Sequence, residues 1–103
     1  MSHRELIQIA KGKKTVETVE IHPSTQSKFV NIDEEGAITG VLPYELIAFH
    51  DSGSSVLVKL KGAKLYEVTN GYGDLLFFEY QGERHQQINL DFFLGEVVRK
   101  PNI

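Results

Sequence analysis

Apolar and polar residues alternate through most of the region from residue 28 to residue 90, as in half-buried β-strands. Glycine-containing turns at 34–36 and 52–54 each separate two such runs, and a third turn begins at Asn70-Gly71. Turns of these kinds are typical of antiparallel hairpins. We therefore expect a mainly β fold, in which an antiparallel meander forms a twisted roll or a partly closed barrel. With helices at its ends the chain could equally be classed as α+β.

Two of the predicted strands are apolar on both faces. In the stretch 45–51, Ile47 and Phe49 lie on one face and further apolar residues lie on the other. In the stretch 74–81, Phe77 likewise lies on the face opposite to other apolar residues. A strand of this kind is usually buried on both sides. Each should therefore be a central strand, or meet a partner on both sides.

The N-terminal segment has the signals of a short helix. Ser2 and Glu5 form a capping box, Ile9 belongs to an apolar face with helical spacing, and Gly12 can end the helix. A competing prediction is a strand through Ile7 and Ile9 that turns at 11–14. We expect the helix.

The C-terminal segment predicts a second helix. Asn89 can cap its start and Pro101 prevents its extension. Its apolar residues recur at i, i+3, i+4, i+7 and i+8, namely Leu90, Phe93, Leu94, Val97 and Val98. Such a helix would cover part of the sheet.

One helix cannot cover all of the surplus apolar side chains. A helix of about ten residues is about 15 Å long and spans two or three strands. Phe49, Phe77 and Phe92 then compete for cover, and exposed apolar patches mark association. We therefore expect these three residues at the interface of a homo-oligomer, with a dimer favoured.

Composition limits the other possibilities. The 103 residues are 41% apolar and 24% charged, which is typical of a single globular domain, here 1–103. The net charge of −3 makes nucleic acid an unlikely partner, and no apolar run is long enough to span a membrane. The chain has no cysteine, so disulfides and thiolate chemistry are excluded. We expect a cytoplasmic protein.

Few residues point to catalysis. His85 and Arg84, in the stretch "GERHQQ", could provide acid/base chemistry, and His50 beside Asp51 is a further candidate. The alternative for 82–87 is a polar hairpin turn with solubilising glutamines. No nucleophile motif, phosphate-binding loop or metal-ligand spacing is present in the sequence. We therefore predict no metal and no cofactor.

These patterns favour a non-catalytic binding module. We expect it to self-associate and to present an aromatic-lined concavity, with Tyr66, Tyr72 and Tyr80 as candidate contacts for a protein or small ligand. The first alternative is a small-molecule enzyme that uses His85 and Arg84. The second is a β-barrel that binds single-stranded nucleic acid through lysine-rich loops and stacking rings.

Overall fold

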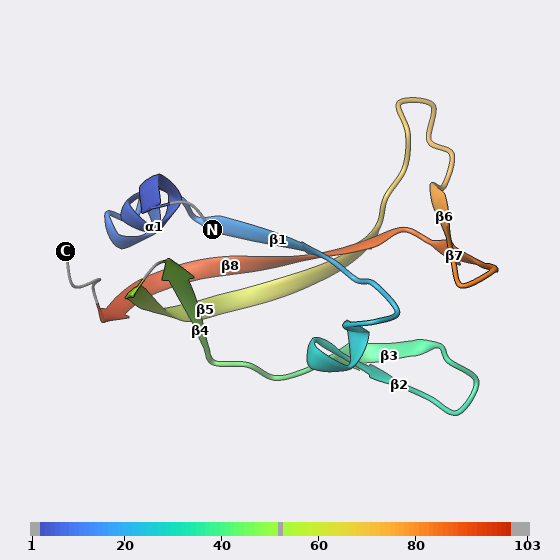
Figure 1. The fold of residues 1–103 in the computed structure, drawn as a ribbon, viewed down its shortest axis with the longest axis horizontal. Helices are drawn as coiled ribbons and strands as arrows, with labels where there is room; N and C mark the ends of the chain where they lie inside the picture. The colour runs from blue at the N-terminus through green and yellow to red at the C-terminus, as the bar shows by residue number, and fades with distance from the viewer. Residues whose placement is uncertain (1–2, 52, 100–103) are drawn as a thin grey trace. The chain divides into compact units, whose positions relative to one another are not determined.

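The protein is mainly antiparallel β, with one helix near its N-terminus (Figure 1). The computed structural model describes residues 3–51 and 53–99. In chain order the elements are α1 (His3–Ala10), β1 (Val16–Glu20), the 3-10 helix η1 (Gln26–Lys28), β2 (Val30–Ile32), β3 (Ile38–Val41), β4 (Leu46–Asp51), β5 (Ser54–Glu67), β6 (Phe77–Tyr80), β7 (Glu83–Gln86) and β8 (Ile88–Arg99). They form a four-stranded sheet in the order β1-β8-β5-β4, and the pairs β2-β3 and β6-β7. The predicted fold class is confirmed.

The described residues divide into two compact units. The first combines residues up to 17 with 44–63 and the segment from 92 onward, and the second combines 18–43 with 64–91. The strands β1, β5 and β8 contribute residues to both units. The expectation of one domain over residues 1–103 stays a prediction, and each unit is described in turn.

The core of the first unit lies beneath α1. Leu6 and Ile9 are 0% and 2% exposed, and the helix packs against β4. Gly12, with φ of +71°, adopts a left-handed conformation just after the helix. The predicted N-terminal helix is therefore confirmed and the competing strand is wrong. Ser2, the expected capping residue, lies outside the described residues.

The hairpin β4–β5 forms around the predicted turn. Its register pairs Leu46 with Lys59 and Asp51 with Ser54, and Gly53 has φ of +92°. Phe49 is only 7% exposed, yet β4 lies at the edge of the sheet. The prediction that 45–51 forms a central strand is therefore wrong. The alternation of apolar residues indicates which side chains are buried. It does not indicate whether a helix or neighbouring strands bury them.

The C-terminal segment forms strand β8, so the predicted C-terminal helix is wrong. Leu90, Phe92 and Leu94 are buried alternately, which is the period of a strand. The Leu94 amide donates to the Thr15 carbonyl at 2.8 Å, in line with the pairing of β1 and β8. Aromatic and β-branched residues suit a strand, and this long-range pairing overrides the helical spacing. Pro101 lies outside the described residues.

In the second unit, the hairpin β2–β3 follows its sequence signals. Gly36 has φ of +85° in the connecting turn. The Asp33 carboxylate accepts hydrogen bonds from the backbone amides of Glu35 and Ala37, both at 2.9 Å. An aspartate that ties its own turn together in this way fixes the loop locally.

The Asn70-Gly71 turn forms, but the long hairpin expected around it does not. The Asn70 side chain accepts hydrogen bonds from the amides of Tyr72 and Asp74, at 2.8 and 3.1 Å. Beyond this loop, the two arms share one isolated bridge, between Thr69 and Leu75. The aromatic strand β6 pairs with β7 instead, so the prediction that 74–81 is a central strand is also wrong.

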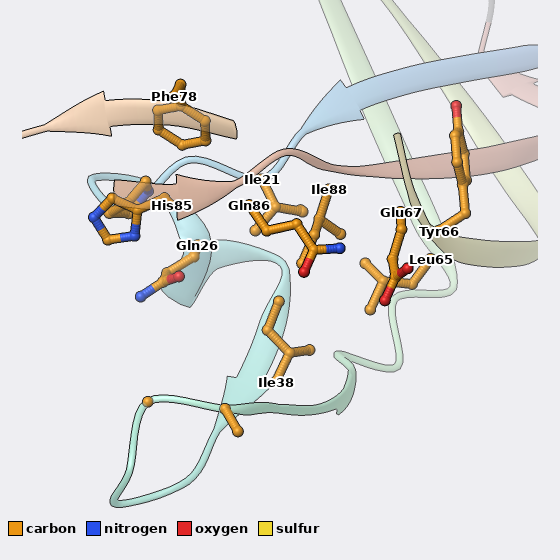
Figure 2. A pocket seen from close by; sticks show the side chains of 13 residues that line it. Ile21, Gln26, Ile38, Leu65, Tyr66, Glu67, Phe78, His85, Gln86 and Ile88 are labelled. Carbon is orange, nitrogen blue, oxygen red and sulfur yellow. The ribbon is translucent and has the colours of Figure 1, made fainter. Parts of the chain in front are cut away.

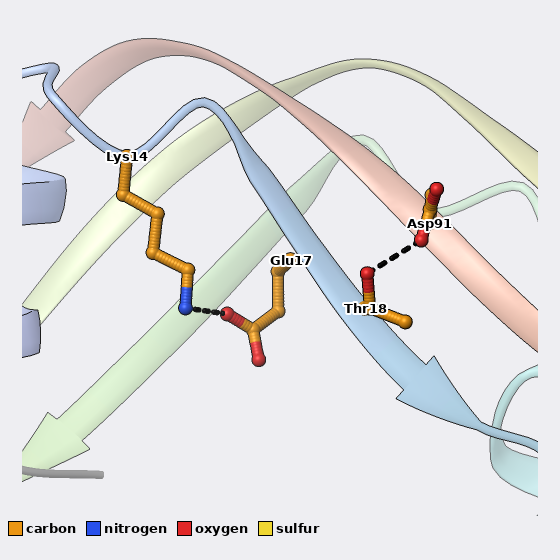
Figure 3. Close-up of polar contacts among 4 residues, drawn as sticks. All are labelled: Lys14, Glu17, Thr18 and Asp91. Carbon is orange, nitrogen blue, oxygen red and sulfur yellow. Dashed lines mark hydrogen bonds and ion pairs between the residues drawn. The ribbon is translucent and has the colours of Figure 1, made fainter.

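Polar contacts support β1 within each unit (Figure 3). In the first unit, Lys14 Nζ lies 2.6 Å from the Glu17 carboxylate. In the second, the Thr18 hydroxyl donates to Asp91 Oδ1 at 2.6 Å, and the Tyr66 hydroxyl reaches the same oxygen at 3.3 Å. The Asp91 carboxylate therefore anchors both side chains to β8.

Candidate ligand-binding site

A cavity of about 490 Å³ opens in the second unit (Figure 2). This volume lies within the range of small-molecule sites. Its wall comes from segments far apart in sequence, and consists of Ile21, Pro23, Gln26, Gly36, Ala37, Ile38, Leu65, Tyr66, Glu67, Phe78, His85, Gln86 and Ile88. The wall therefore combines apolar and polar surface in similar amounts.

The polar side chains of the cavity wall include two amides. Gln26 and Gln86 provide two side-chain amides, His85 an imidazole and Glu67 a carboxylate. No lysine or arginine belongs to the wall, so its only formal charge with neutral imidazole is negative. Such a wall does not attract anions.

Gln86 has a polar atom without a partner. Its Nε2 atom is buried and makes no hydrogen bond within the described part of the chain. A buried amide donor that is left unsatisfied costs about 1–3 kcal/mol. Asn89 Oδ1 is also buried without a hydrogen-bond partner among the described residues, but Asn89 is not part of the cavity wall.

The end of β7 places Gln86 in the wall. The β6–β7 register pairs Gln86 with Phe77, and the next backbone amide, of Gln87, donates to the Leu76 carbonyl at 2.8 Å. Figure 2 shows the Gln86 side chain among those that line the cavity. Backbone pairing thus holds the chain at Gln86 and Gln87, whereas the side-chain Nε2 of Gln86 makes no hydrogen bond within the described residues.

Aromatic and imidazole rings pack together beside the cavity. Phe78 stacks against His22 and against His85, with 5.6 Å between ring centroids in each pair. Tyr80 meets His22 edge to face at 4.5 Å. His22 is in turn held by Ser24, whose backbone amide donates to its Nδ1 at 3.1 Å. These contacts fix the positions of the Phe78 and His85 rings, which belong to the wall.

The predicted catalytic residues do not form one site. His85 lies in the wall, with its Nε2 3.9 Å from a carboxylate oxygen of Glu83. The Arg84 guanidinium instead lies 4.0 Å above the Phe77 ring. His50 belongs to the first unit, on the exposed side of β4. Among the described residues, no three His, Asp or Glu side chains lie together as metal ligands.

The three predicted tyrosines also separate. Tyr66 lies in the wall, but its hydroxyl donates to Asp91. Tyr80 packs against His22 outside the wall, and Tyr72 is 93% exposed in the 70–73 turn. The sequence reasoning missed Gln86, since a glutamine in a polar stretch carries no signal that separates a cavity wall from a soluble edge.

The three phenylalanines predicted at an oligomer interface differ in exposure. Phe49 and Phe92 are buried in the core of the first unit, at 7% and 2% exposed. Phe77 belongs to the second unit, is 44% exposed and lies under Arg84. Only Phe77 therefore offers substantial ring surface, and a role in association stays a prediction.

The comparisons with known proteins gave no relative. No family model, no curated protein sequence and no solved structure matches the chain. Within the described residues, no helix is long and apolar enough to cross a membrane. The function must therefore be argued from the site itself.

Proposed function

We propose that this protein is a non-catalytic binding module that holds a small ligand in the cavity of its second unit. The unpartnered amide of Gln86 in the wall supports this proposal most directly. Buried donors are normally satisfied, and binding sites are among the places where an exception occurs. Because Nε2 is closed to solvent, the Gln86 side chain must turn toward the cavity before a ligand atom can accept from Nε2 and remove the penalty.

The wall defines the chemistry of the ligand. Its volume of about 490 Å³, and the apolar side chains such as Ile38 and Leu65 that it combines with polar groups, suit a compact body with both apolar and polar parts. The Gln86 donor requires a carbonyl oxygen or a ring nitrogen as acceptor. Because Glu67 is the only group of fixed charge in the wall, an anion would be disfavoured. The ligand class is therefore an uncharged amide or heterocycle.

The catalytic and nucleic-acid alternatives have less support. The predicted pair His85 and Arg84 is divided, because the guanidinium packs on Phe77. The lysine-rich loops of the nucleic-acid hypothesis are 11–14 and 59–64. One lysine of each already has a carboxylate neighbour: Lys14 lies 2.6 Å from Glu17, and Lys59 lies 3.6 Å from Glu96. The separated His85 and Arg84 do not favour acid/base catalysis, and the paired lysines do not favour binding of a nucleic-acid backbone.

The proposal can be tested with matched neutral and anionic fragments, of which nicotinamide and nicotinate form one pair. We expect the neutral members to shift the side-chain amide resonance of Gln86 in NMR titrations. The anionic members should bind at least about tenfold more weakly, which corresponds to 1.4 kcal/mol. Equal binding of both members, or no response from Gln86 to any neutral member, would contradict the proposal.

The variant Gln86→Leu separates binding from folding. Leucine has a similar size but no donor, so we expect it to abolish fragment binding and to raise the free energy of unfolding by about 1 kcal/mol. The matched control is Gln87→Leu at the adjacent position, which lies outside the wall and should leave fragment binding unchanged. Loss of binding in both variants, or in neither, would count against the site.

A further inference from the structure

The strand β4 has one edge with no partner strand in the described residues. The Leu60 amide donates to the Glu45 carbonyl at 2.9 Å, and the hairpin register is regular from that point to its turn. In an antiparallel pair, residues alternate between hydrogen bonding to the partner strand and pointing away from it. The N–H and C=O groups of Leu46, Ala48 and His50 therefore point away from β5.

This edge lacks most of the features that normally prevent pairing, and its one charged side chain on the inward face, Asp51, lies at the end of the strand. Exposed edges are usually protected by prolines, lysines, bulges or inward-pointing charges. The segment Leu46–Asp51 contains no proline or lysine, and its register has no bulge. Leu46 is 43% exposed, and both Ala48 and His50 are exposed. The other edge strand of the sheet, β1, instead carries two glutamates among its five residues.

We propose that β4 pairs antiparallel with β4 of a second copy of this chain. A two-fold axis at Ala48 would place its backbone opposite that of Ala48 in the second copy, and Leu46 opposite His50. All three outward-facing residues of each strand would then exchange hydrogen bonds. The smallest side chain would lie on the axis, and no charged side chains would be opposed between Leu46 and His50. At each end of the pairing Asp51 would face Glu45 of the second copy, and this like-charge contact weakens the dimer.

A second copy fits this edge better than an unrelated strand, because the pattern is self-complementary. In the β4–β5 register Leu46 lies opposite Lys59 and Ala48 lies opposite Leu57, and these side chains share one face of the sheet. Across the axis, the apolar side chains Leu46 and Leu57 of the two copies would extend one continuous strip. A six-residue edge buries less than the roughly 1,200–2,000 Å² of a standard interface. The dimer is therefore weak and depends on concentration.

This inference is independent of the ligand cavity, and sedimentation velocity tests it. The average mass of the wild-type protein should rise toward that of a dimer between about 10 µM and 1 mM, as a weak interface requires. Ala48→Pro removes an outward-facing donor without removing a bond to β5, so it should weaken association at least tenfold. Val16→Pro, at the first residue of β1, is the matched control and should associate as the wild type does.

Cysteine cross-linking tests the register without a proline, should Ala48→Pro fail to fold. The chain has no cysteine, so each variant carries a single thiol. Opposed hydrogen-bonded residues have Cα atoms about 5.5 Å apart, within the range of a disulfide. With a mild oxidant, Ala48→Cys should form a covalent dimer at least tenfold faster than Val16→Cys. A monomeric wild type, unchanged association of folded Ala48→Pro, or equal cross-linking of the two cysteines would overturn the inference.

Discussion

At the scale of single residues, two unusual positions lie at opposite ends of the β6–β7 hairpin. Gln86 has a buried donor without a partner, and Gln81 is the one non-glycine residue with positive φ among the described residues. Both features cost free energy. They differ in purpose, because the first faces a cavity, whereas Gln81 only closes an exposed turn.

The turn residue Gln81 predicts a stabilising substitution. Gln81 and Gly82 have φ of 51° and 79°, and the flanking pair Tyr80 and Glu83 closes a two-residue hairpin. Two positive φ values define the turn in which Asn-Gly is strongly preferred. Gln81→Asn should therefore raise the free energy of unfolding by about 0.5 kcal/mol, and the melting temperature by about 2–4 °C.

Thermal unfolding followed by circular dichroism measures this effect. The control is Gln81→Val, since a β-branched residue is poorly compatible with positive φ and should lower the melting temperature. If the asparagine and valine variants melt at the same temperature, Gln81 does not have a positive φ in this turn.

At the scale of elements, local signals succeeded where the structure is local. The turns at Gly36 and Gly53 and the helix around Leu6 and Ile9 were predictable, because each depends on neighbours within a few residues. Strand β8 was not predictable in this way. Its apolar residues satisfy helical spacing, while the pairing that decides the outcome reaches Thr15 at the other end of the chain.

Gly95 tests the strand assignment of the C-terminal segment. A Cβ at this position would lie 3.0 Å from Lys61 Cγ and 3.1 Å from the Lys59 carbonyl oxygen. A backbone carbonyl cannot move aside cheaply, so Gly95→Ala should lower the free energy of unfolding by about 1 kcal/mol. In a helix, the same change would raise it by about the same amount. The sign of the change therefore distinguishes the two structures.

Chemical denaturation measures both this variant and its control. The control is Gly62→Ala in β5, where the added Cβ would meet only Phe93 Cδ2, at an ordinary 3.8 Å. That change should be neutral or stabilising by about 0.5 kcal/mol, because glycine weakens a strand interior. A stabilising Gly95→Ala would contradict strand β8.

The binding site was less predictable than the strands that form it. Its wall includes residues near 21, 37, 66 and 86, which no local pattern connects. Aromatic residues were expected to line it, and Phe78 does, but the decisive polar group is a glutamine. The proposed role of Gln86 depends on the lack of a hydrogen-bond partner for its Nε2 among the described residues of the folded chain, and a sequence alone does not indicate this.

At the scale of the whole molecule, the open question is whether the two units fold as one. Each has buried apolar side chains: Leu6 belongs to the first unit, and Val30 and Leu90 belong to the second. Three strands, however, run through both units without a break in the chain. Since a strand is stable only while its neighbours are paired, we expect the units to unfold in one cooperative step.

The substitution Leu6→Ala tests this cooperativity, because it removes a fully buried side chain from the first unit only. The cavity left behind should lower the free energy of unfolding by about 2–5 kcal/mol. Hydrogen exchange resolved by residue gives the opening free energy at Val58 in the first unit and at Leu90, on the part of the central strand β8 that belongs to the second unit. In one cooperative domain both amides lose the same protection, because both exchange through global unfolding. If Leu90 keeps its wild-type protection while Val58 loses its own, the chain contains two independent domains, and the prediction of a single domain over residues 1–103 is wrong.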